Sequence, residues 1–197
     1  MNTHVKKLFV ITLIGFSLTV YFGLTVFILP EQYMSHEKLV SQPHFEVEIS
    51  DREISLGESF RLDIITENSG EYGDIHILST AFPTLIEIGN VVKIITYDFT
   101  QPPANTMSGD EMIAKYSGGL EHIVAKYSSI EAMSRPIYPG STYHLSQVIT
   151  PEKSGNFSIY IKSVNIPHTS DLSHYPQTGI LDHQEEYVQV YSVNVNP

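Results

Sequence analysis

Residues 44–64 read HFEVEISDREISLGESFRLDI, and two parts of this stretch alternate apolar and polar residues. The apolar members are Phe45, Val47 and Ile49 in the first part and Phe60, Leu62 and Ile64 in the second. A period of two places the apolar side chains on one face of a β-strand and the polar ones on the other. Gly57 lies between the two parts, where a turn is expected. The stretch therefore predicts two antiparallel strands, each buried on one face.

Five further segments are rich in β-branched and aromatic residues and are bounded by turn residues. They are residues 75–82, 91–99, 142–150, 156–166 and 186–195. Seven short strands separated by turns are typical of a β-sandwich. We therefore predict a mainly β fold for residues 44–197.

Two motifs in this region resemble a known class of module. Residues 55–60, SLGESF, followed by Asn68-Ser69-Gly70, resemble the opening strands of immunoglobulin-like modules of the cell-adhesion type in prokaryotic surface proteins. Residues 151–159, PEKSGNFSI, are similar to the turn and penultimate strand of such modules. The whole chain also resembles single-pass surface proteins of archaea, which implies an exterior location in the cell envelope. The resemblance implies a seven-stranded immunoglobulin-like sandwich and no particular activity.

Residues 108–135 depart from this pattern and predict a helical insertion. Ser108 stands three residues before Glu111, the spacing of a capping box. The sequence of residues 113–117, IAKYS, is nearly repeated at 124–128, VAKYS. This offset of 11 residues corresponds to three helical turns and would place Tyr116 and Tyr127 on one face. Both interpretations of these tyrosines stay open: packing against the sheet, or contact with a partner.

The N-terminal part of the chain predicts a membrane span over residues 8–29, where no side chain is charged. At about 1.5 Å per residue this helix is roughly 33 Å long, compared with a hydrocarbon core of about 30 Å. The span runs into Pro30 without a small-residue cleavage site, which favours an uncleaved signal anchor over a signal peptide. Its expected partner is the lipid bilayer.

Charge on the two sides of the span predicts its orientation. Lys6 and Lys7 precede it, so residues 1–7 are expected in the cytoplasm and the C-terminal domain outside the cell membrane. Residues 30–43 then form a juxtamembrane linker. The residues after the span include nine basic residues and all 22 acidic residues of the chain, which gives a formal charge of −13. Such a domain repels nucleic acid, so DNA and RNA are excluded as partners.

Small residues recur every four positions in the predicted span, at Gly15, Thr19 and Gly23. Small side chains let membrane helices approach closely, so this face predicts packing against a second helix; small residues are also tolerated in any span. Outside the span, Asn156 begins an Asn-Phe-Ser glycosylation sequon.

Histidines offer the strongest candidate chemistry. His168, His174 and His183 fall in one connection before the last predicted strand, and imidazoles bind copper or zinc. Their spacing matches no established metal signature, and solvated loop histidines are the simpler interpretation. Metal binding is therefore the alternative function, and otherwise no cofactor is expected.

Catalytic motifs are missing from the sequence. It contains no G-x-S-x-G elbow, no H-E-x-x-H and no phosphate-binding glycine loop. The absence of cysteine also excludes disulfides and a thiol nucleophile. We therefore expect a non-catalytic, membrane-anchored module that binds a membrane or cell-surface protein, or serves as an accessory subunit of a membrane complex.

Overall fold

The computed structural model describes residues 3–24, 40–114, 121–167, 173–182 and 185–197, in two compact units, Met1–Lys38 and Leu39–Pro197. The first unit contains helix α1 (Thr3–Gly23). Its segment Val5–Gly23 has a mean hydropathy of 1.6 and is not buried, so it is long and apolar enough to cross a membrane. A signal sequence has the same properties, and positions 25–29 of the predicted span lie outside the described residues.

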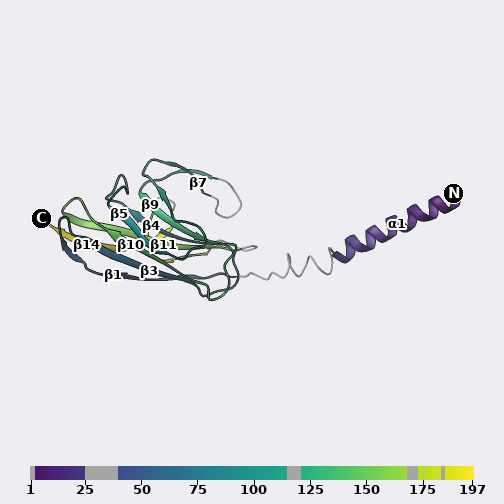
Figure 1. Ribbon diagram of the computed structural model, residues 1–197, viewed down its shortest axis with the longest axis horizontal. Helices are drawn as coiled ribbons and strands as arrows, with labels where there is room; N and C mark the ends of the chain where they lie inside the picture. The colour runs from purple at the N-terminus through teal and green to yellow at the C-terminus, as the bar shows by residue number, and fades with distance from the viewer. Residues whose placement is uncertain (1–2, 25–39, 115–120, 168–172, 183–184) are drawn as a thin grey trace. The chain divides into compact units, whose positions relative to one another are not determined.

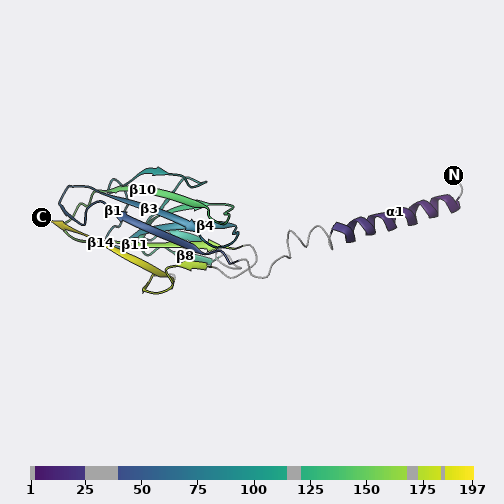
Figure 2. The ribbon, with the colours of Figure 1, turned by 90° about the horizontal axis from the view of Figure 1, so that it is seen from below.

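The second unit is built almost entirely from β-strands (Figures 1 and 2). One sheet contains, in order, β1 (Pro43–Ile49), β3 (Phe60–Asn68), β10 (Thr142–Ile149) and β5 (Val92–Tyr97). The larger sheet contains, in order, β13 (Ile180–Leu181), β14 (Tyr187–Asn196), β11 (Gly155–Ile166), β4 (Ile75–Phe82), β9 (Ser128–Ser134) and β6 (Ala104–Thr106). Strand β2 (Glu53–Ser55) pairs with β14, β12 (Ser173–Tyr175) pairs with β11, and β7 (Glu111–Ala114) pairs with β8 (Glu121–Val124).

Seven of these strands have the topology of an immunoglobulin-like sandwich. Taken in chain order, β1, β3, β4, β5, β10, β11 and β14 correspond to strands A to G of the constant-type domain. The order β1-β3-β10-β5 is then A-B-E-D, and the order β14-β11-β4 is G-F-C. These are the seven strands that the sequence predicts. The predicted total of seven is too low, however, because the described residues contain seven further strands besides them.

Alternation in the sequence reappears as alternation in burial. Phe60, Leu62 and Ile64 are fully buried on one face of β3, whereas Arg61 on the other face is exposed. The buried face packs against side chains of the second sheet, and Phe60 contacts Phe157 with their ring centroids 6.0 Å apart. Large buried side chains of both sheets form one core: Phe60, Leu62, Ile64, Leu145, Ile149, Leu78, Phe82, Ile130, Ile159 and Ile161.

The predicted helical insertion at 108–135 is wrong for its described part, which is β-structure. Strands β7 and β8 form a hairpin, and β9 pairs with β4 along its whole length. Ser108 caps no helix, because its hydroxyl donates to the carbonyl of Lys126. Ser128, Ser129 and Ser134 of β9 are buried although they are polar, so burial in this strand does not follow an alternation of apolar and polar residues. Helix propensity is a weak preference that such pairing overrides.

Candidate functional site

A cleft lies at one end of the sandwich, and we call it the end cleft. It has a cavity volume of about 530 Å³ and lies between the loop from Thr84 to Val91 and the segment from Pro151 to Phe157. At this end Phe60 pairs with Ile149, whereas Pro43 pairs with Asn68 at the other. The cleft is therefore opposite the end at which the chain enters the domain.

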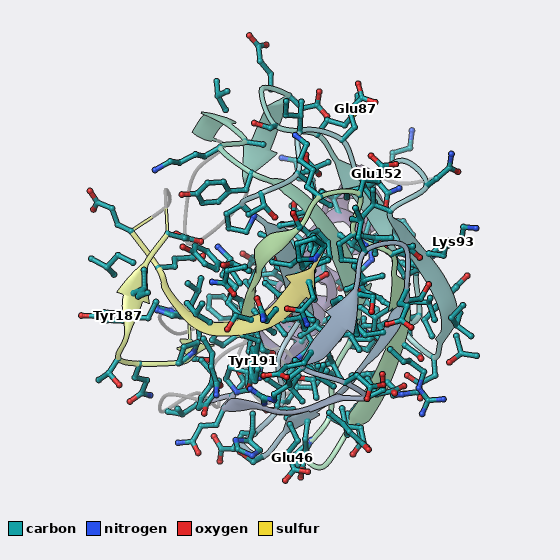
Figure 3. The ribbon with its side chains drawn as sticks, turned by 90° about the vertical axis from the view of Figure 1, so that its left-hand side faces the viewer. Glu46, Glu87, Lys93, Glu152, Tyr187 and Tyr191 are labelled. Carbon is teal, nitrogen blue, oxygen red and sulfur yellow. The ribbon has the colours of Figure 1, made fainter. Side chains whose placement is uncertain are left out.

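The end cleft has an apolar floor and a charged rim. Val91 and Phe157 are buried at its floor, while the side chain of Ile86 is 78% exposed. The backbone of Ile86 is nevertheless fixed, since its carbonyl accepts a hydrogen bond from the hydroxyl of Ser128. Figure 3 looks onto this end of the sandwich, with the rim residues Glu87 and Glu152 on the same side of it.

A second site, which we call the lysine cluster, lies on the outer face of the larger sheet. Lys162 projects from the middle of β11, yet its side chain is only 6% exposed. Its Nζ lies 2.6 Å from Oδ2 of Asp182 and also contacts Oε2 of Glu186. Both carboxylates come from the turn between β13 and β14, where Glu186 N–H donates to Oδ1 of Asp182 over 3.1 Å.

A small pocket adjoins the lysine cluster. Ser79 and Ala81 of β4 and Ala125 line it with short side chains, and Glu131 of β9 reaches it from the opposite side to Asp182. Burial raises the pKa of the Glu131 carboxyl; nearby Lys162 opposes the shift and Glu186 adds to it. The lysine cluster therefore lies beside a third carboxyl group, that of Glu131, whose charged form burial disfavours.

Between the sheets, a polar network surrounds the fully buried His76 of β4. Its Nδ1 lies 2.5 Å from Oδ1 of Asn165, and the amide of Asn165 donates to Asn68. The Oδ1 atom of Asn165 can only accept a hydrogen bond, so the neutral His76 ring carries its proton on Nδ1. Nε2 then accepts from the hydroxyl of Thr66 or Ser163. Burial lowers the pKa of His76 to about 4, so the ring is neutral at physiological pH.

Of the predicted metal ligands, only His174 lies within the described residues; it is half-buried on β12. His168 and His183 lie outside them. Within the part of the chain that the structure describes, no group of three or more histidine, aspartate or glutamate residues has the geometry to hold a metal ion. The predicted metal site stays a prediction.

The other predicted site residues have separate surroundings. Tyr127 is half-buried against Tyr160, with ring centroids 5.7 Å apart, while Tyr116 lies outside the described residues. In α1, the hydroxyl of Thr19 donates to the carbonyl of Gly15 over 2.9 Å, and Gly23 ends the helix. Asn156 is exposed at the start of β11 and lines the end cleft.

Sequence reasoning missed both the lysine cluster and the His76 network. Apolar Phe157, Ile159 and Ile161 alternate with polar residues just before Lys162, so its position predicts a solvated side chain on the outer face. One local signal was available: Asp182, Glu185 and Glu186 concentrate acidic residues just before the last strand. Nothing local indicates that Lys162 would meet them, because the contact depends on how β13 and β14 pair.

Comparison with solved structures finds matches at low identity and low TM-scores. A cohesin module from a Clostridium perfringens family 33 glycoside hydrolase matches over 81% of this chain and 98% of its own, at 10% identity and a TM-score of 0.40. The major pilin subunit of Bacillus cereus matches over 79% of this chain and 40% of its own, at 14% identity and a TM-score of 0.40. A β-glucosidase from Listeria innocua matches over 81% of this chain and 17% of its own, at 13% identity and a TM-score of 0.39. No family model and no curated protein matches the chain.

Proposed function

We propose that this chain is a membrane-anchored, extracytoplasmic binding or assembly module without catalytic residues, and that it contacts a protein partner through the end cleft. The observation that carries the proposal is the cleft itself, whose floor is apolar. The exposed side chain of Ile86 lies at this cleft, and a hydrogen bond to the Ile86 carbonyl holds its backbone in place. The cavity volume of the cleft, about 530 Å³, is in the range typical of binding sites. The apolar segment Val5–Gly23 supports the anchor.

The chemistry of the cleft limits its partner. Apolar floor residues favour an inserted aliphatic or aromatic side chain, which is how the central contacts of protein interfaces are made. Two carboxylates on the rim, Glu87 and Glu152, outnumber the one ammonium of Lys153, and the whole domain has an acidic excess, so basic residues are favoured around that side chain. Asn156 lines the same cleft, so a glycan on its side chain would compete with the partner for this space.

Replacing Ile86 with Asp tests the proposal. The full-length chain is extracted from its own membranes in mild detergent, and co-purified partners are quantified by native mass spectrometry. Because Ile86 is 78% exposed, the substitution should leave the fold intact while placing a charge in the contact. We expect recovery of the partner to fall by about tenfold or more.

The matched control is Ile95→Asp, which introduces the same charge at a side chain of β5 that is 55% exposed and outside the cleft. Recovery should stay at the level of the unmodified chain in this variant. Equal recovery from the Ile86 and Ile95 variants would refute the end cleft as the contact surface.

A further inference from the structure

The contact between Lys162 and Asp182 is almost closed to solvent. Each side chain is only 6% exposed, and Glu186 beside them is 10% exposed. Taking charged groups out of water is unfavourable, and mutual attraction does not always offset that cost. A neutral group in place of the ammonium and one carboxylate would remove the penalty for both.

The Asp182 carboxylate is held in a fixed orientation toward the amine. Its Oδ2 lies 2.6 Å from Nζ of Lys162, and its Oδ1 accepts the backbone N–H of Glu186 over 3.1 Å. The turn is fixed in addition by the backbone bond from Asp182 N–H to the Glu186 carbonyl, at 2.8 Å. A donor on Oδ1 polarises the carboxyl carbon and stabilises negative charge that develops on that oxygen during attack.

A proton acceptor is already in contact with the amine. Oε2 of Glu186 touches Nζ of Lys162, so this carboxylate can take a proton and leave the nitrogen with a free electron pair. Attacking and attacked groups that are held together in this way react with effective concentrations far above those in solution. The lysine cluster thus contains a nucleophile, an electrophile, a base and an oxyanion donor.

We propose that Lys162 and Asp182 form an intramolecular amide bond. A bond forms between Nζ and the side-chain carboxyl carbon of Asp182, and the bond from that carbon to Oδ2 breaks. The ammonium gives up two protons, one of them carried by Glu186, and both leave with Oδ2 as one water molecule. The positive and negative charges cancel, so the reaction consumes no oxidant, reductant or other co-reactant.

The surroundings can accommodate both products. The adjoining pocket, which Ser79, Ala81 and Ala125 line with short side chains, has a cavity volume of about 20 Å³. This is enough for one water molecule, so the departing oxygen has a place to go. The amide would join the middle of β11 to the turn between β13 and β14 and fix that edge of the larger sheet.

The intact mass of the full-length chain, purified in detergent, tests the bond directly. We expect a mass that is lower than the sequence mass by one water molecule. Trypsin then locates the loss, because no lysine or arginine follows Lys162. Trypsin does not cleave at an acylated lysine, so residues 154–197 should stay together as one peptide that lacks one water.

Two variants assign the roles. Lys162→Arg keeps the positive charge but cannot form this amide, so the chain should have its full sequence mass. Glu186→Gln keeps the shape of the side chain but removes the base, and should also have full mass. The matched control for Glu186 is Glu185→Gln, since Glu185 is an exposed residue of the same turn and its variant should still lose one water.

Two results would overturn the amide bond, and a third would overturn the role of Glu186 as the base. A full sequence mass for the unmodified chain, with separate peptides 154–162 and 163–197, would show that the contact is an ion pair only. Loss of water with a free 154–162 peptide would place the dehydration at an aspartate alone, as in a cyclic imide. Loss of water in Glu186→Gln would remove Glu186 from the reaction.

Discussion

At the scale of single residues, His76 makes stability depend on pH. Its pKa is about 4 in the folded domain, against about 6.5 in an unfolded chain. Above pH 6.5 both states are neutral and the full stability is present. As pH falls below 6.5, His76 becomes protonated in the unfolded chain but stays neutral in the folded domain. The free energy of unfolding therefore decreases until the pH reaches about 4. We expect a loss of about 2 kcal/mol by pH 5, measured by urea unfolding at pH 7.5 and pH 5.

Substitution separates this effect from other titrations. His76→Gln removes the titrating ring but keeps hydrogen-bonding groups, so its stability should fall less between the two pH values than that of the unmodified chain. His144→Gln is the control, because the His144 side chain is 38% exposed and its replacement leaves the buried ring in place. If the unmodified chain and His76→Gln lost stability equally, His76 would not be the group responsible.

At the scale of elements, α1 carries a prediction about association within the membrane. Replacing Gly15, Thr19 and Gly23 together with Leu should prevent a second helix from approaching this face. We expect co-purification of membrane partners to fall by about tenfold, equivalent to roughly 1.4 kcal/mol. Quantitative recovery from native membranes measures the effect.

The opposite face of α1 supplies the comparison. Ser17 and Tyr21 are also four residues apart but point away from the small residues, so the double replacement Ser17→Leu and Tyr21→Leu should leave recovery unchanged. Undiminished recovery from the triple variant would mean that the small-residue face makes no contact.

The segment at residues 108–135 shows how sequence and structure diverge within an element. Its 11-residue near repeat fits three helical turns, and its residues tolerate a helix. The near repeat nevertheless contributes Ile113 to β7 and Val124 to β8, which lie in opposite strands of one hairpin. Strand pairing decided the outcome, because β9 pairs with β4 along its whole length and buries Ile130 and Ala132 in the core.

At the scale of the whole molecule, the alternative function is metal uptake. Replacing His168, His174 and His183 together with Ala should abolish stoichiometric binding of Cu²⁺ or Zn²⁺ by the full-length chain, because imidazole nitrogens are the proposed ligands. Metal analysis after dialysis measures the bound ion. Uptake that is absent from the unmodified chain, or unchanged in the triple variant, would refute the hypothesis.

A second triple variant makes that experiment specific. Replacing His36, His44 and His144 with Ala removes the same number of imidazoles elsewhere in the chain. Uptake should persist in this variant if the three histidines before the last strand are the ligands, and an equal loss would indicate binding spread over many histidines.

Alternation of apolar and polar residues, together with runs of β-branched and aromatic residues, was enough to predict the seven strands of the sandwich, which are β1, β3, β4, β5, β10, β11 and β14. Alternation is a local property, because neighbouring residues of a strand point to opposite faces. The buried face of a strand can therefore be predicted from a few consecutive residues, such as 60–64. The apolar segment at the N-terminus is readable for the same reason, because its length and composition are contiguous.

Only the tertiary structure decided which polar side chains meet. His76 contacts Asn165, which is 89 positions away, and Lys162 contacts Asp182 through a turn that must first pair with β14. Such contacts depend on strand register, and a shift of one residue would turn each side chain to the opposite face. The charges and hydrogen bonds at these sites are therefore products of pairing between distant strands, which no local pattern encodes.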